Sequence, residues 1–224
     1  MKTIFPLLAC LLLLPIPTRA STLVWGSTPG DSLYTSYGLA LDANFIFELG
    51  TFGSFIPTLA NADEWLTNWK VFDRAQAPAI DGWNPGAGYF ASEATLTTTY
   101  QSTSPYASSS VTFAAGEQVY IWTYNTLVFA QGAEWALITN DSSDGNAGDN
   151  WVMPEPECCG ASVLEFRVED ATKVPLGGVN DERGPGTFTA DPPAYQLQTA
   201  SVPEPGAGFL LGALALAAGL RRRR

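Results

Sequence analysis

The sequence contains no histidine, and for its 224 positions it has few cysteines and few basic residues. Without histidine the chain lacks the usual general base of serine and cysteine hydrolases and the commonest nitrogen ligand for zinc and copper. Its three cysteines are Cys10 and the adjacent pair Cys158 and Cys159, which do not make a disulfide framework. Most familiar catalytic constellations are therefore unavailable, and we expect a protein that is not an enzyme.

Basic residues are also unevenly placed along the chain. Of 11 Lys and Arg residues, Lys2, Arg19 and Arg221–Arg224 lie close to the two ends. Setting these six aside, together with Glu204, leaves 5 basic and 21 acidic residues in 21–203, a net charge of −16. Such a surface repels nucleic acid and anionic lipid headgroups, so we expect no nucleic-acid partner.

The first twenty residues have the pattern of a secretory signal peptide. A short basic start, Met1-Lys-Thr, precedes the apolar run Ile4 to Ile16 and the small-residue site Thr18-Arg-Ala20. We expect export through the secretion translocon and cleavage after Ala20. Cys10 lies inside the apolar run instead of at its end, so the lipoprotein alternative is disfavoured and Cys10 is discarded with the signal.

The last two dozen residues combine three features. Val202-Pro-Glu-Pro205 cannot continue a strand or helix, because both prolines lack an N–H and fix φ. Gly206 to Leu220 then carries no charged side chain, and as a helix it would measure roughly 22 Å against about 30 Å of bilayer hydrocarbon. Arg221, Arg222, Arg223 and Arg224 follow as a membrane-stop cluster on the cytoplasmic side. This order predicts a transmembrane anchor, with everything up to Ser201 outside.

The order and spacing of Val202, Pro203, Glu204, Pro205, the apolar run 206–220 and the arginines resemble the PEP-CTERM sorting signal of envelope proteins. The resemblance implies that an exosortase, a membrane-embedded protease, cleaves near Pro203-Glu204-Pro205. The inner membrane would then hold the chain only transiently. It also implies a cell-surface or extracellular-matrix protein associated with exopolysaccharide and biofilm. The alternative is an ordinary transmembrane anchor in which Pro-Glu-Pro is accidental.

Between the two ends, residues 21–200 are expected to form one secreted β domain. We predict an all-β fold, a mainly antiparallel β-sandwich or jelly-roll-like domain with one short helix over 61–74, where Trp65, Trp69 and Phe72 have helical spacing. The strands are expected at 22–25, at 39–55 with breaks at Gly50 and Gly53, and at 89–91, 93–100, 117–124, 134–139, 162–168 and 195–199. In 162–168 the alternation indicates a one-sided antiparallel sheet.

The strand at 117–124 puts Tyr120, Trp122 and Tyr124 on one face. Packing in the core is the favoured interpretation, because seven Trp in one domain need apolar surroundings. If the face were exposed, it would form a sugar-stacking platform, and the domain would be a carbohydrate-binding module. A carboxylate-dependent glycoside hydrolase is the second alternative, since paired acids need no histidine.

Two short segments offer candidate sites. The turn 140–150 contains Asp141, Asp144 and Asp149 with amides and glycines, which are weak candidates for a Ca²⁺ site. It fails the EF-hand pattern at its twelfth position, and a solvated turn is the favoured interpretation. Adjacent Cys158 and Cys159 are expected to form a vicinal disulfide in an oxidising compartment, with free thiols or an intermolecular bridge as alternatives.

Overall fold

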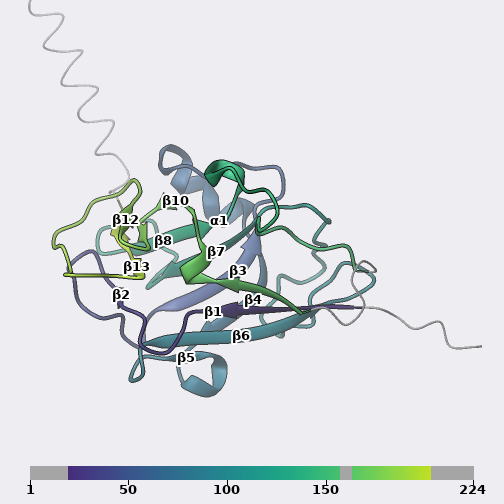
Figure 1. Ribbon diagram of the computed structural model, residues 1–224, viewed down its shortest axis with the longest axis horizontal. Helices are drawn as coiled ribbons and strands as arrows, with labels where there is room; N and C mark the ends of the chain where they lie inside the picture. The colour runs from purple at the N-terminus through teal and green to yellow at the C-terminus, as the bar shows by residue number, and fades with distance from the viewer. Residues whose placement is uncertain (1–19, 157–162, 203–224) are drawn as a thin grey trace, which may run out of the picture.

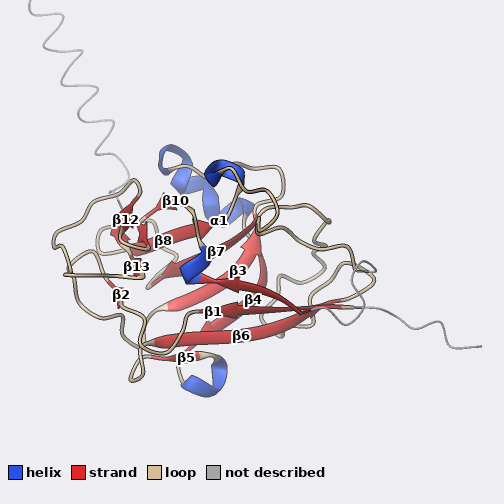
Figure 2. Ribbon diagram, viewed as in Figure 1, coloured by secondary structure: helices blue, strands red, loops and turns tan. Residues whose placement is uncertain are grey.

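The computed structural model describes residues 20–156 and 163–202 (Figure 1). In this part of the chain most regular structure is β-strand, with one short α-helix and a few turns of 3-10 helix (Figure 2). Most strand pairs are antiparallel. The prediction of a mainly antiparallel all-β domain with one short helix is therefore confirmed.

The first sheet has four strands in the order β5-β6-β1-β9. They are β1 (Ser21–Gly26), β5 (Trp83–Asn84), β6 (Tyr89–Leu96) and β9 (Val163–Arg167). β1 pairs antiparallel with β6 but parallel with β9. The expected antiparallel setting of the 162–168 strand was therefore wrong: alternation indicates which face is buried, but carries no information on the direction of the neighbouring strand.

The second sheet has six strands, in the order β10-β8-β7-β3-β4 with β14 also paired to β8. They are β3 (Ile46–Thr51), β4 (Lys70–Gln76), β7 (Val119–Tyr124), β8 (Glu134–Thr139), β10 (Lys173–Leu176) and β14 (Ala200–Ser201). All residues of β7 and β8 are buried. These two strands therefore form the centre of the molecule.

A third, smaller sheet and five short helical segments complete the fold. The sheet contains β12 (Glu182–Arg183), β11 (Gly178–Val179), β13 (Leu197–Gln198) and β2 (Leu33–Tyr34), in that order. The helical segments are η1 (Leu59–Glu64), α1 (Trp65–Asn68), η2 (Ala79–Asp81), η3 (Ser142–Asp144) and η4 (Val168–Asp170).

The main core lies between the two larger sheets. Leu23 and Trp25 of β1 and Phe90 of β6 belong to the same buried cluster as Phe47 of β3 and Ile121 of β7. The rings of Phe47 and Phe90 stack with their centroids 3.9 Å apart, one from each sheet. Burial of side chains from both sheets, at about 25 cal/mol per Å² of apolar surface, holds the two layers together.

A second, aromatic core covers the other face of the six-stranded sheet. Tyr120, Trp122 and Tyr124 of β7 pack there with Trp65 of α1 and Trp135 of β8. Trp122 meets Trp65 and Trp135 edge to face, with centroids 5.8 and 5.1 Å apart. The predicted alternation of this strand is confirmed, because Val119 and Ile121 belong to the main core. Both faces of the strand are thus buried.

The predicted helix over 61–74 was wrong in its second half. Helical structure ends at Asn68, and Lys70–Gln76 is strand β4, paired with β3. Trp65 and Trp69 belong to the aromatic core, whereas Phe72 points to the main core on the other side of the sheet. The helical spacing of the three rings was therefore a coincidence, and pairing with β3 outweighed local propensity.

Several strand boundaries also differ from the prediction. Within 39–55 only β3 is a strand, and Leu39 is 66% exposed. Tyr89–Leu96 is one continuous strand instead of two. At Gly50 the register with β4 shifts, and a Cβ there would lie 2.2 Å from the carbonyl oxygen of Lys70. The predicted irregularity at Gly50 therefore reflects close approach of the neighbouring backbone.

Candidate functional site

The C-terminal strand fixes the point at which the chain reaches the predicted sorting motif. Ala200 and Ser201 pair with Trp135 and Glu134 of β8, and the N–H of Val202 donates to the carbonyl of Ala133 at 2.9 Å. Val202 is 4% exposed and belongs to the aromatic core. The last described residue is therefore a buried part of the fold, and it stands directly before Pro203.

A buried carboxylate secures this C-terminal segment. Glu134 is 4% exposed, and its oxygens accept hydrogen bonds from the N–H and hydroxyl of Ser36 at 2.9 and 2.5 Å and from the hydroxyl of Thr199 at 2.6 Å. These donors come from segments far apart in the sequence. One carboxylate thus ties together the residues after β2, strand β8 and the residue before β14.

An open hollow of about 850 Å³ lies between the turn after β8, strand β9 and the turn after β11. Its lining includes five carboxylates and no lysine or arginine among the described residues; we call it the acidic hollow, and its carboxylates are Asp149, Glu165, Glu169, Asp170 and Glu182. Trp151 and Phe166 contribute to its floor, being 2% and 3% exposed. The chemistry of this lining suits hydroxyl-rich or cationic ligands.

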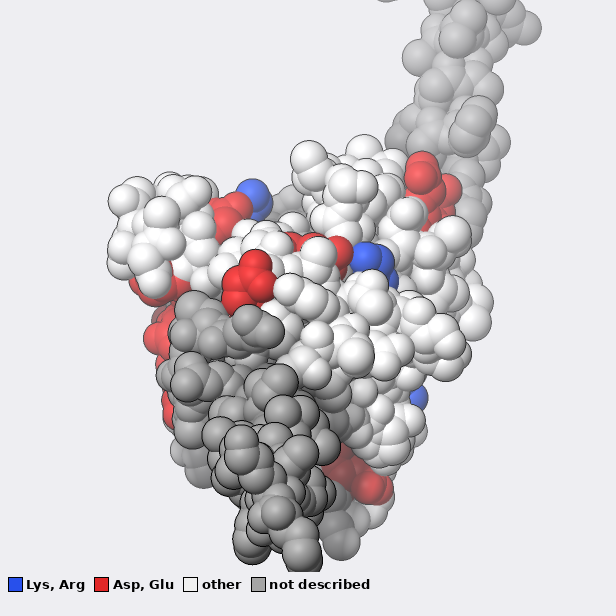
Figure 3. Space-filling model, turned by 90° about the vertical axis from the view of Figure 1, so that its right-hand side faces the viewer, with Lys and Arg blue, Asp and Glu red and all other residues white. Residues whose placement is uncertain are grey.

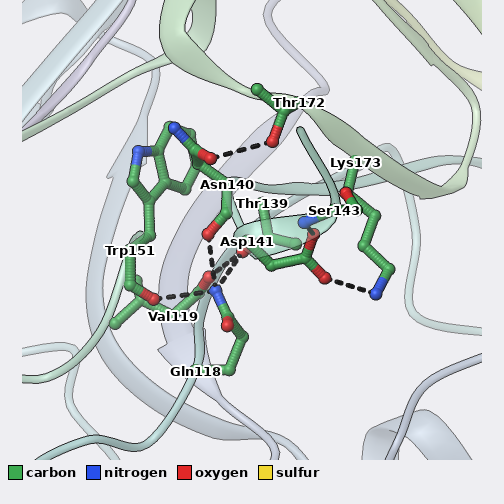
Figure 4. Close-up of polar contacts among 9 residues, drawn as sticks. All are labelled: Gln118, Val119, Thr139, Asn140, Asp141, Ser143, Trp151, Thr172 and Lys173. Carbon is green, nitrogen blue, oxygen red and sulfur yellow. Dashed lines mark hydrogen bonds and ion pairs between the residues drawn. The ribbon is translucent and has the colours of Figure 1, made fainter. Parts of the chain in front are cut away.

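A single amide organises the rim of the acidic hollow (Figure 4). Nε2 of Gln118 contacts the carbonyl oxygens of Asn140 and Trp151 at 2.9 and 2.8 Å and the hydroxyl of Thr139 at 2.6 Å. The side-chain oxygen of Asn140 accepts from the hydroxyl of Thr172 at 2.8 Å. The base of the turn 140–150 is therefore held by Gln118, directly before β7, and by Thr172, directly before β10.

Asp141 of this turn is directed at Lys173, not into the acidic hollow (Figure 4). Partial burial alone would raise the pKa of its carboxyl, but hydrogen bonds from Lys173 and Ser143 and the positive charge of Lys173 outweigh this effect. The pKa of Asp141 is therefore lowered from its usual value of 3.8. The pair links the turn to β10.

Two of the three Ca²⁺ candidates, Asp141 and Asp149, have different partners in the structure. Asp141 pairs with Lys173, whereas Asp149 accepts a hydrogen bond from Asn146 at 2.9 Å and lines the acidic hollow. Asp144 ends η3. Among the side chains that the structure describes, which do not include that of Asp144, no group of three or more acidic, Cys or His side chains is placed to hold a metal ion. Calcium binding at the turn stays a prediction.

The remaining predicted site residues lie outside the described residues. They are Pro203, Glu204 and Pro205 of the sorting motif, Arg221, Arg222, Arg223 and Arg224 of the membrane stop, and Cys158 and Cys159. Val202 is the exception, as described above. The described residues contain no helix long and apolar enough to span a bilayer.

The sugar-stacking platform on β7 does not exist. Tyr120, Trp122 and Tyr124 are 9%, 0% and 2% exposed and are covered by Phe52, Trp65 and Trp135 of the aromatic core. Core packing, the favoured interpretation of this strand, is confirmed. A carbohydrate-binding module could not use this face, and any sugar contact would need a different surface.

Sequence reasoning did not find the acidic hollow. Nothing in the spacing of Glu165, Glu169 and Asp170 indicates that Glu182 and Asp149 lie nearby. On the face shown in Figure 3, acidic side chains lie scattered among uncharged ones with few basic side chains between them.

No protein-family model, no curated protein and no solved structure matches this chain.

Proposed function

We propose that the chain is an exported cell-surface or extracellular-matrix protein that an exosortase sorts and processes at Pro203-Glu204-Pro205. In this proposal the signal peptide is removed after Ala20 and the apolar run 206–220 is a temporary membrane anchor. The resemblance of the tail to PEP-CTERM signals supports the assignment, as does the order of motif, apolar run and arginines.

The observation that carries the proposal is the position of the two predicted processing points, which lie directly before the first and directly after the last of the described buried residues. Ser21, the first residue after the expected signal cleavage, is 2% exposed and begins β1. Val202, the residue before the Pro-Glu-Pro motif, is 4% exposed, and it is the last described residue and part of the aromatic core. Removal of both ends would therefore leave the described domain complete.

Replacement of Pro203, Glu204 and Pro205 by alanine tests the proposal. We expect the wild-type mature protein to lack the apolar run, and the alanine variant to remain in the membrane with Leu220 still attached, as measured by intact-protein mass spectrometry. Wild-type protein that still contains Leu220 would support the ordinary anchor instead.

The chain supplies its own control, because Pro154-Glu155-Pro156 is a second copy of the tripeptide without an apolar run behind it. Glu155 is exposed in the structure, whereas Pro156 is buried. A Pro154→Ala/Glu155→Ala variant should be processed like the wild type. Loss of processing in this control would mean that folding, not recognition of the tail, limits cleavage.

For the mature domain we propose a non-enzymatic scaffold, a β-sandwich or jelly-roll-like unit associated with exopolysaccharide. The absence of histidine and the two packed sheets support this assignment. The acidic hollow favours one second candidate, a carboxylate-dependent glycoside hydrolase, because its lining brings several carboxylates together.

Incubation of the processed protein with the producing cell's polysaccharide separates these functions. We expect no new reducing ends, and any retention of the protein on the polysaccharide should weaken when Glu169 and Asp170 are replaced by their amides. New reducing ends that disappear in the same Glu169→Gln/Asp170→Asn variant would establish the hydrolase and overturn the scaffold.

A further inference from the structure

The loop between β7 and β8, residues 125–132, lies beside the end of the described chain. The N–H of Asn125 donates to the carbonyl of Glu134, which closes the loop, and the N–H of Val202 donates to the carbonyl of Ala133. Since β14 runs antiparallel to β8, the chain moves toward this loop as it approaches Val202. The described chain therefore ends at Val202, next to residues 125–132.

This loop is uncharged and has four apolar residues at its centre, 127–130, in a domain that is otherwise strongly acidic. Its sequence, Asn-Thr-Leu-Val-Phe-Ala-Gln-Gly, contains no charged residue. Leu127 and Phe129 pack partly against the aromatic core, with the ring of Phe129 5.7 Å from that of Trp135. Val128, between them, is 65% exposed. The loop thus presents an apolar tip on a well-anchored base.

The base is held by hydrogen bonds as well as by packing. Nε1 of Trp135 donates to the carbonyl of Thr126 at 2.7 Å, and the side-chain amide of Asn125 donates to the carbonyl of Gly132 at 3.0 Å. The first contact fixes one arm of the loop to β8, and the second joins the two arms to each other. The exposure of Val128 is therefore set by the fold of the loop.

The distance between this loop and the anchor is short. Only Pro203, Glu204 and Pro205 separate Val202 from Gly206, so a fully extended chain places Val202 at most about 14 Å from the start of the apolar run. The headgroup layer of one leaflet takes up about 6 Å of this reach. A domain anchored by 206–220 is thus held with Val202 and the neighbouring loop at the membrane surface.

We propose that Val128 and the β7–β8 loop insert into the headgroup region of the bilayer while the tail is in place. The proposal rests on the proposed function, because the apolar run must be the anchor. Because the loop carries no charge, anionic headgroups do not repel it as they repel the acidic surface of the domain. The contact is too small to hold the domain without the tail, so it orients the anchored protein and ends when the tail is cleaved.

Electron paramagnetic resonance of the chain 21–224 in phosphatidylethanolamine/phosphatidylglycerol vesicles tests this contact. Cys158 and Cys159 are replaced by serine, and a nitroxide is attached at Val128→Cys or, as the matched control, at Ile80→Cys. Ile80 is 91% exposed on η2, the helical turn beside β5 at the bottom of Figure 1, whereas the described chain ends at the upper left. The ratio of collisions with oxygen to collisions with a water-soluble nickel chelate is measured.

We expect this ratio to be several-fold higher at position 128 than at position 80. A second label at Gln131→Cys, an exposed position of the same loop, should also exceed the control. Equal ratios at all three positions in a chain that floats with the vesicles would overturn the inference and leave the proposed function standing. A chain that does not float would overturn the anchor, and the inference with it.

Discussion

Glu48 illustrates how burial changes the role of a single acidic residue. It is 1% exposed, and its carboxylate accepts hydrogen bonds from Nε1 of Trp69 at 2.7 Å and from Nε and Nη2 of Arg74 at 2.9 and 2.5 Å. Because each oxygen has a charged or N–H partner, the desolvated carboxylate is compensated. In the sequence, Glu48 is indistinguishable from the acids of the surface.

Two tyrosines of the aromatic core give the domain a specific sensitivity to alkali. Burial and, secondarily, the negative charge of Asp141 raise the pKa of Tyr120 from 10.0 to about 12. Burial and the charge of Glu48 raise the pKa of Tyr124 as well. The folded state therefore disfavours both phenolates.

The sign of the pH effect follows directly. Because the pKa of Tyr120 is higher in the folded than in the unfolded state, the neutral phenol leaves the free energy of unfolding unchanged below pH 10. This free energy then falls as the pH rises from 10 towards 12. We expect Tyr120→Phe to reduce the loss of unfolding free energy over this interval by about 2 kcal/mol. Urea titrations at several alkaline pH values measure it, and Tyr37→Phe, at a ring 54% exposed, is the matched control. Equal pH slopes in both variants and the wild type would contradict the prediction.

At the scale of elements, the turn 140–150 depends on contacts outside itself. Lys173 of β10 pairs with Asp141, with side chains 49% and 19% exposed. Because the pKa of Asp141 is lowered in the folded state, the pair stabilises the fold above about pH 4 and loses its effect as the pH falls through the folded pKa.

Replacement of Lys173 by methionine should therefore lower the melting temperature at neutral pH and have little effect in strong acid. Both groups contact solvent, so the expected cost is about 0.5 kcal/mol. Asp141→Asn and the double variant complete a double-mutant cycle. A coupling energy that persists unchanged in strong acid would show that charge is not its origin.

The segment 59–76 shows where local sequence patterns stop being informative. Its aromatic residues do have helical spacing, but Trp69 packs in the aromatic core and Phe72 in the main core, on opposite faces of the second sheet. The choice between helix and strand there is made by pairing with β3, which no short window of sequence contains. The strands β7, which alternates, and β8, a short apolar run, were predicted within two residues because pattern and tertiary contacts agree.

At the scale of the whole molecule, fold class was predictable and the acidic hollow was not. Composition and alternation are local properties, so the β-rich domain followed from them. The hollow combines Asp149, Glu165 and Glu182 from three turns and strands, and such proximity depends on sheet order. The parallel pairing of β1 with β9 is a further example, since the local sequence of a strand does not indicate the direction of its neighbour.

That pairing places the first strand of the domain between two much later ones. Leu23 of β1 faces Ala94 of β6 on one side and Leu164 of β9 on the other. The first sheet therefore cannot close until most of the chain is present, and such long-range pairing makes folding slow. A chain that crosses a membrane from its N-terminus would therefore remain unfolded during passage and form its core only afterwards, on the far side.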